Sequence, residues 1–179
     1  MKPHRGMRPQ DIVILLKIIA KGNSSWYSKD LASELYMSAS ELTESLNRSQ
    51  QVGLLDPSKK KVMVTAFMDF LLFGLRYVYP AQAGSIVRGM PTSHAAPILA
   101  KVFKSDEKYV WADVEGTERG QAIEPLYPTV PKAAKLDTKL YELLALTDVF
   151  RVGKTREIKA AMEIMNKIIS TYQKQQLNE

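Results

Sequence analysis

The sequence contains no cysteine and only two histidines among its 179 residues. The absence of cysteine excludes disulfide bonds, a catalytic thiol and thiolate metal sites together. Neither an HExxH zinc pattern nor a phosphate-binding glycine loop occurs. We therefore expect a protein that has no cofactor and no bound metal, and that is not an enzyme.

Long hydrophobic runs are also missing. A helix that spans a bilayer needs about 20 consecutive apolar residues. Asp11 and Lys17 bound the first candidate run, and Asp69 and Arg76 interrupt the second. The N-terminal stretch MKPHRGMRPQD lacks the apolar core and the cleavage site of a signal peptide. We expect a soluble, cytoplasmic protein with no membrane partner.

The charge balance is moderately basic, with a net charge of +6. Residues 1–80 hold 11 Lys/Arg against 7 Asp/Glu, and residues 81–179 hold 14 against 12. An excess of this size favours a polyanionic partner but does not prove one.

The first 80 residues show the pattern of a helix-turn-helix followed by a hairpin. Pro9 begins an apolar helix that ends at Lys21-Gly22, and serines precede the next two helices as N-caps. The stretch LLDPSKKKVMV reads as two short strands around a basic turn, and we call this hairpin the wing. The remaining predicted helices of this half are Lys29–Tyr36, Ser38 or Ser40 to Gly53, and Thr65–Tyr79.

The second half differs in composition. Six of the nine prolines fall between residues 80 and 132, a spacing that excludes long helices there. We expect two short strands in this segment, Tyr109–Trp111 and Gln121–Ile123, and then helices over 137–150 and 155–173. The predicted fold class is mainly α with small β elements, in a winged-helix domain (1–80) and a C-terminal association domain (81–179).

The second helix of the helix-turn-helix carries the candidate DNA-reading residues. Leu42 and Leu46 turn inward, so the opposite face presents short polar side chains that fit the major groove. Asn pairs with adenine, Ser and Thr contact base or phosphate, and the wing lysines suit phosphate. The candidate residues are Ser38, Ser40, Thr43, Glu44, Asn47, Arg48, Lys59, Lys60 and Lys61.

The stretch SKDLASELYMSASELTESLNRSQQVGLLDPSKKKVMVT resembles the winged helix of MarR-like transcriptional regulators. The resemblance covers roughly residues 9–79 and rests on the element order, the leucine spacing and the Gly-Leu-Leu junction before the wing. It implies a transcriptional repressor whose partner is double-stranded DNA. Two features depart from the pattern: Ser49 replaces an apolar residue, and Glu41 and Glu44 put negative charge on the DNA-facing side.

The plan of a winged helix plus a separate C-terminal module is also similar to DNA-binding antitoxins of the AbiEi kind. That similarity implies an antitoxin that represses its own toxin–antitoxin operon and has a cognate toxin as partner. Two other interpretations stay open. Winged helices also act as protein–protein adaptors without DNA binding. A hydrolase would have to use His94, but its neighbour Ser93 is badly placed to pair with it, so a loop histidine bonded to backbone is favoured.

The helix over 137–150 carries two apolar faces, one with Leu140 and Leu144, the other with Leu146 and Val149. The last helix can cover only one of them. The proline-rich segment, or another chain such as a second copy in a homodimer or a protein partner, must cover the other.

The turn between the last two helices gathers four cations. Three lie at the start of a helix, where positive charge opposes the helix dipole. This arrangement predicts contact with an anion or an acidic partner at Arg151, Lys154, Arg156 and Lys159.

Overall fold

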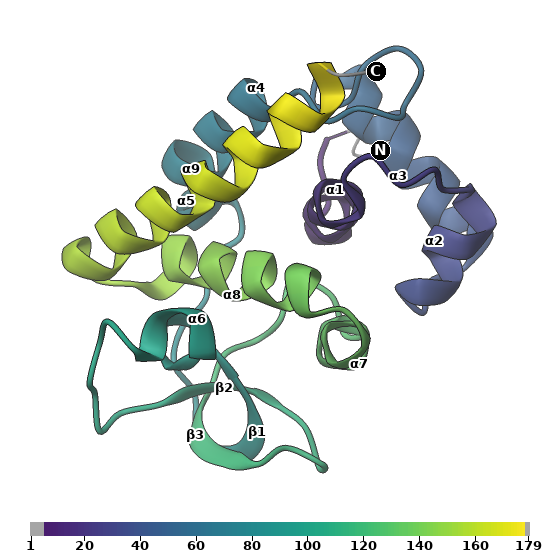
Figure 1. Ribbon diagram of the computed structural model, residues 1–179. Coiled ribbons are helices and arrows are strands. Elements are labelled where there is room, and N and C mark those ends of the chain that lie inside the picture. The colour runs from purple at the N-terminus through teal and green to yellow at the C-terminus, as the bar shows by residue number, and fades with distance from the viewer. Residues whose placement is uncertain (1–5, 178–179) are drawn as a thin grey trace.

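The computed structural model describes residues 6–177 and is mainly helical, with one small sheet (Figure 1). The first half contains α1 (Pro9–Lys21), α2 (Ser28–Glu34), α3 (Ala39–Gln51), α4 (Val64–Asp69), a π-helical turn (Phe70–Gly74) and α5 (Leu75–Val78). The second half contains β1 (Ile86–Thr92), a 3₁₀ turn (Ser93–Ala95), α6 (Pro97–Ala100), β2 (Tyr109–Ala112), β3 (Glu118–Ala122), α7 (Val130–Leu136), α8 (Thr138–Val152) and α9 (Thr155–Leu177). The expectation of a mainly α fold with small β elements is confirmed. No helix within the described residues is long and apolar enough to cross a membrane.

Local capping explains where α3 begins and ends. The Ser38 hydroxyl accepts a hydrogen bond from the Glu41 backbone N–H at 3.1 Å, and the Glu41 carboxylate accepts one from the Ser38 N–H at 3.0 Å. This reciprocal capping box fixes Ser38 rather than Ser40 as the N-cap. Gly53, at φ 79°, takes the left-handed conformation just beyond the C-terminal end.

The single helix predicted over 65–79 is interrupted by the π-helical turn Phe70–Gly74. Gly74 lies under the Phe70 ring, where an added Cβ would meet the ring at 3.0 Å. The sequence pattern does not predict this interruption, because the helical segments on both sides of it keep helical periodicity.

The sheet contains a strand that the sequence pattern did not predict. β1 pairs antiparallel with both β2 and β3, which pair parallel with each other, so the three strands close on themselves. Gly89 and Pro91 made this segment read as loop. Gly89 is required there because a Cβ would lie 2.0 Å from the Trp111 carbonyl oxygen. The strands expected near 109–111 and 121–123 are present, but they do not form a hairpin.

Helix α8 lies at the centre of the molecule (Figure 1). Its residues from Leu143 to Arg151 are all buried. It packs against α1, α5, α7 and α9, and also against β1 and the 3₁₀ turn. Both apolar faces of α8 are therefore covered by this same chain, and the alternative of another chain on its second face is wrong.

The hydrophobic core continues across the domain boundary expected at residue 80. One cluster of buried side chains runs from Ile12 in α1 to Tyr172 in α9. The Tyr172 hydroxyl accepts a hydrogen bond from the Val62 N–H at 3.2 Å, and the Arg76 guanidinium donates to the Gly153 carbonyl at 2.7 Å. The two halves form one packing unit.

A buried lysine joins the halves electrostatically. Lys17 Nζ in α1 lies 2.6 Å from Asp137 Oδ2, at the start of α8, and 2.6 Å from Glu34 Oε2 in α2. Burial alone raises the pKa of both carboxyls. The hydrogen bonds and charge of Lys17, together with those of Lys21 at Glu34 and the Leu140 N–H at Asp137, outweigh burial, so both pKa values are lowered below their ordinary 3.8 and 4.5. The carboxylates are therefore more readily ionised in the folded state than in the unfolded state.

Because both pKa values are lowered on folding, the stabilisation is present near neutral pH and is lost as pH falls through the lowered values. We expect Lys17→Met to lower the free energy of unfolding at neutral pH by about 1–3 kcal/mol. The difference from the parent should shrink as the pH falls through the lowered pKa values of the two carboxyls. Urea unfolding across pH measures this, with exposed Lys139→Met as the control. A gap that does not change with pH would contradict the assignment.

Candidate nucleic-acid interface

Helix α3 turns a polar face to solvent. Ser40, Thr43, Glu44 and Asn47 are exposed, while the opposite side, which includes Leu42, is buried. A helix of 13 residues is about 20 Å long. This face therefore offers short polar side chains along a rod that fits a major groove about 12 Å wide.

The wing is a tight hairpin built around Asp56. A single antiparallel bridge joins Leu55 to Val62. The Asp56 carboxylate accepts hydrogen bonds from the backbone N–H groups of Lys60 and Lys61, each at 2.8 Å. Burial raises the pKa of Asp56, but these bonds and those from Ser58 outweigh it and the pKa is lowered. An ionised Asp56 thus fixes the backbone of the turn that carries the lysines.

The wing and α3 are joined directly. Lys59 Nζ donates to Asn47 Oδ1 at 2.5 Å. Lys60 Nζ donates to the Trp26 carbonyl at 3.0 Å and lies 3.8 Å above the Trp26 ring. A groove of about 220 Å³ lies between these elements, and Thr43 also lines it. The structure therefore brings four residues together on one surface: Thr43, Asn47, Lys59 and Lys60.

Trp26 and Ser28 complete this groove and were missed from the sequence. Trp26 precedes α2 and is 8% exposed, so it packs under the wing. The only available signal was an aromatic pair, Trp26-Tyr27, in a serine-rich loop before a helix. Nothing local indicates that Trp26 receives a lysine 34 residues away.

Arg48 does not lie on the outward face. Its guanidinium donates to both carboxylate oxygens of Asp11, at 3.0 and 2.7 Å, and Asp11 is completely buried. The Asp11 hydrogen bond raises the pKa of Arg48 further above its ordinary value. Arg48 therefore holds α3 against α1, and its expected place among the outward-facing candidate residues is wrong.

The Glu41 carboxylate already meets the partial positive charge at the N-terminus of α3. The Glu41 carboxylate bonds to the Ser38 N–H and hydroxyl, and its other oxygen accepts from the Tyr127 hydroxyl at 2.8 Å. These bonds lower the pKa of Glu41. Ser38 is therefore occupied as a cap. Glu44 remains exposed, 3.7 Å from Arg48 Nη1.

The C-terminal half supports the turn between α2 and α3. The Thr129 hydroxyl donates to the Leu35 carbonyl at 2.7 Å, and Lys132 Nζ lies 4.6 Å from the centre of the Tyr36 ring. Tyr36 has a φ of 55°, so the turn takes a conformation that side chains rarely adopt. Residues 127–132 thus hold the turn before α3 in place from outside the first 80 residues.

The four cations expected at the turn before α9 do not lie together. Arg151 is buried: its guanidinium donates to Asp148 Oδ1 and to the carbonyls of Tyr79 and Glu124. Asp148 in turn accepts from Trp111 Nε1 at 2.6 Å. Arg151 therefore belongs to an internal network. The exposed members of the set are Lys154, Arg156 and Lys159.

These three cations lie far from the α3–wing surface. They occupy the first turns of α9, whereas Tyr172, which contacts the wing at Val62, is near its other end. At 1.5 Å per residue this separation is about 25 Å. The two basic regions are separate surfaces.

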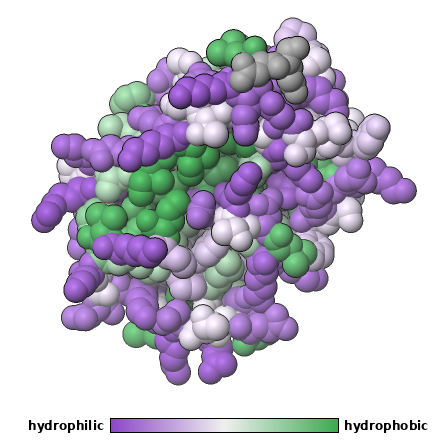
Figure 2. Space-filling model, viewed as in Figure 1, coloured by the Kyte–Doolittle hydropathy of each residue, from purple (hydrophilic) through white to green (hydrophobic). Residues whose placement is uncertain are grey.

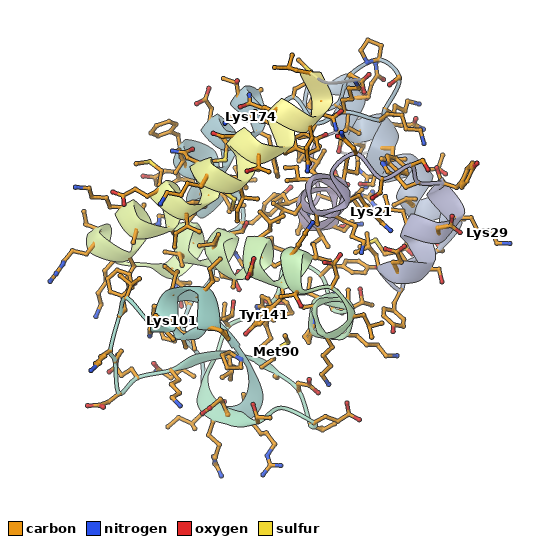
Figure 3. The ribbon with its side chains drawn as sticks, in the orientation of Figure 1. Lys21, Lys29, Met90, Lys101, Tyr141 and Lys174 are labelled. Atoms are coloured by element: carbon orange, nitrogen blue, oxygen red, sulfur yellow. The ribbon has the colours of Figure 1, made fainter. Side chains whose placement is uncertain are left out.

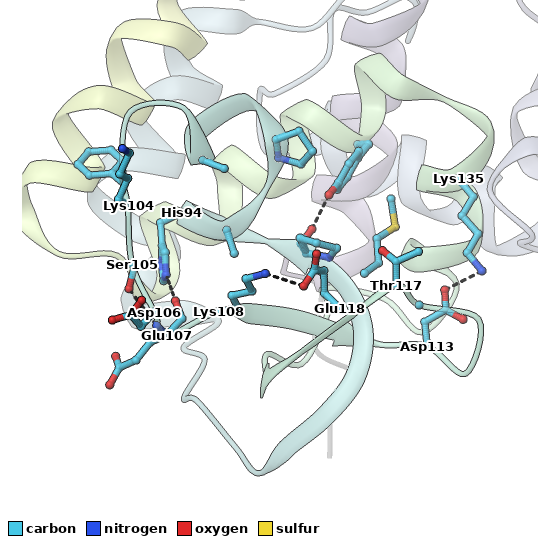
Figure 4. A pocket seen from close by; sticks show the side chains of 18 of the residues that line it. His94, Lys104, Ser105, Asp106, Glu107, Lys108, Asp113, Thr117, Glu118 and Lys135 are labelled. Carbon is cyan, nitrogen blue, oxygen red and sulfur yellow. Dashed lines mark hydrogen bonds and ion pairs between the residues drawn. The ribbon is translucent and has the colours of Figure 1, made fainter.

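His94 lines a cavity of about 930 Å³ between the small sheet, α7 and α8 (Figure 4). Its Nε2 hydrogen-bonds the Glu107 carbonyl at 2.8 Å, while the Ser93 hydroxyl is buried without a hydrogen-bond partner among residues 6–177. The Ser–His contact that nucleophilic catalysis needs is therefore not formed in this structure.

Two ion pairs lie on the rim of this cavity. Lys108 pairs with Glu118 at 2.6 Å, and Lys135 pairs with Asp113 at 2.7 Å. Tyr141, labelled below α8 in Figure 3, donates to the Pro91 carbonyl, and burial raises its pKa to about 12. Within residues 6–177, no three His, Asp or Glu side chains gather as metal ligands.

No protein-family model matches the chain, and comparisons with curated proteins and with solved structures found no significant match. Its function must therefore be argued from the chemistry of its own surfaces.

Proposed function

We propose that this chain is a DNA-binding transcriptional regulator that reads double-stranded DNA with α3 and its basic wing. The observation that carries the proposal is the Asn47–Lys59 hydrogen bond, which joins an exposed polar helix face to a lysine-bearing hairpin in one surface. The length of α3 and the small size of its outward side chains support entry into the major groove.

The geometry suggests a division of roles. Thr43 and Asn47 face the base edges, and Asn47 can pair bidentately with adenine. Lys59 occupies the Asn47 carbonyl oxygen in the free protein. A phosphate beside the wing would draw Lys59 away and release Asn47 for a base. Glu44 is exposed and can accept from cytosine N4, so it contributes selectivity rather than affinity.

The narrower form of the proposal is that the protein represses its own operon, as an antitoxin paired with a cognate toxin would. A protein bound at the promoter of that operon would exclude RNA polymerase. Preferential binding to DNA from upstream of its own gene, compared with random duplex, would support the autorepressor form of the proposal.

One observation favours a second candidate, a protein adaptor. Phe73 and Tyr77, on the π-helical turn and α5, are 73% and 80% exposed. Exposed aromatic side chains are typical anchors of protein interfaces. In that case the α3–wing surface would show no preference among DNA sequences.

The first prediction for this surface concerns the helix. Thr43→Ala and Asn47→Ala should each reduce discrimination for the preferred site by about 1–3 kcal/mol per lost base contact, while affinity for random duplex barely changes. Binding isotherms on both duplexes measure this. Thr171→Ala and Asn166→Ala on exposed positions of α9 are matched controls, because Thr171 makes the same hydroxyl-to-carbonyl bond, four residues back, as Thr43. Unchanged discrimination in both α3 variants would show that α3 does not read bases.

The second prediction concerns the wing. Replacing Lys59, Lys60 and Lys61 with Ala should weaken specific and random DNA binding alike. It should also flatten the slope of log K against log salt by roughly 0.9 per lost phosphate contact. A salt series on each duplex provides the slope. Thermal unfolding checks the fold, because Lys60 also packs on Trp26.

The matched control replaces three exposed lysines away from the wing, Lys101, Lys139 and Lys167, and so makes the same change in net charge. If the wing variant kept the parental slope, or if the control lost as much slope, the wing would not be a phosphate contact.

A further inference from the structure

A second concave surface lies at the end of the molecule opposite the wing. It is a groove of about 850 Å³ between the loop that follows α6 and the first turns of α9. Figure 1 shows α9 beginning on the same side of the molecule as α6 and this loop. The residues that matter here are Val102, Phe103, Lys104, Lys154, Arg156 and Lys159.

The groove is strongly cationic. Lys104, Lys154, Arg156 and Lys159 are exposed, and none of the four forms an ion pair within residues 6–177. Three of them also oppose the dipole at the start of α9, at a cost that a bound anion would relieve. Ion pairs among residues 6–177 therefore do not balance the positive charge of these four side chains.

The two carboxylates in the groove do little to offset this charge. Glu157 is turned inward: its side chain is 15% exposed, and Oε2 accepts a hydrogen bond from the Lys154 N–H at 2.8 Å. Its other oxygen lies 3.8 Å from His94 Nδ1. Glu163 is therefore the one outward-facing carboxylate among the groove residues.

The floor of the groove is apolar. Val102 is 60% exposed and Phe103 is half-buried beside it. Figure 2 shows a hydrophobic surface bordered by hydrophilic side chains on the face that carries α9. An apolar floor inside a cationic rim fits a ligand that presents both an apolar side chain and negative charges.

We infer that this groove docks an acidic segment of a partner protein. An aliphatic or aromatic side chain would lie on Val102 and Phe103, and carboxylates would pair with the surrounding cations. Arg156 offers the planar two-donor geometry that binds carboxylate bidentately. The apolar floor favours a peptide, which brings an apolar side chain with its carboxylates, over the phosphate backbone of nucleic acid. The inference does not depend on DNA binding by α3.

Selection from a random dodecapeptide library against the full chain, followed by fluorescence anisotropy of synthetic selected peptides, tests the inference. We expect peptides enriched in Asp and Glu together with an apolar residue. The charge reversal K154E/R156E/K159E should weaken their binding by at least about tenfold. Val102→Ser should weaken it several-fold without changing the charge.

The matched control is K139E/K167E/K174E, which makes the same charge change outside the groove; Lys174 lies towards the far end of α9 (Figure 3). This control and Asn47→Ala should both keep parental peptide affinity. Arg156→Glu alone serves if the triple variant fails to fold.

Three results would overturn the inference. The first is a selection with no enrichment, or with no acidic bias. The second is selected peptides that bind the groove variant as tightly as the parent. The third is a duplex of about 20 base pairs that loses affinity through the groove variant while the peptides do not. Each result leaves the α3 measurements unaffected, so failure here is distinguishable from failure of the DNA proposal.

Discussion

The ion pair between Asp11 and Arg48 sets which face α3 shows to solvent. Asp11 is completely buried, and a buried carboxylate must be paired to remain ionised. Arg48 meets this need with two hydrogen bonds from the third turn of α3. Removing either partner would leave an unpaired buried charge, which typically costs about 3–5 kcal/mol. With Arg48 directed inward, Thr43 and Asn47 necessarily point outward.

The rest of the chain holds that helix and its wing in register. Tyr127 and Thr129 bond to α3 and to the preceding turn, Tyr172 contacts the wing at Val62, and Lys17 ties α1 to the start of α8. The surface formed by α3 and the wing therefore depends on the C-terminal half, although none of the residues that we propose to contact bases comes from there. This arrangement explains why the core shows no break near residue 80.

Local sequence rules predicted most of the helices. Pro9, Ser38 and Gly53 act through caps and conformational preferences that operate within one turn, so their effects can be read from neighbouring residues. The grouping of Thr43 and Asn47 with the wing lysines also followed from helix periodicity and the hairpin signal.

Features decided by distant partners could not be read this way. Arg48 was expected on the outward face because its partner, Asp11, lies 37 residues earlier. Arg151 was expected in an exposed basic turn, but Asp148 and the carbonyls of Tyr79 and Glu124 bury it. Strand β1 was hidden by Gly89 and Pro91, because only its pairing with two other strands makes it a strand.

The central claim is that α3 and the wing form one DNA-reading surface. Backbone amide hydrogen exchange of the whole chain, with and without duplex from upstream of its own gene, tests it most directly. The account predicts added protection confined to residues 39–51 and 56–62. Protection centred on residues 154–163, or none at saturating duplex, would contradict it.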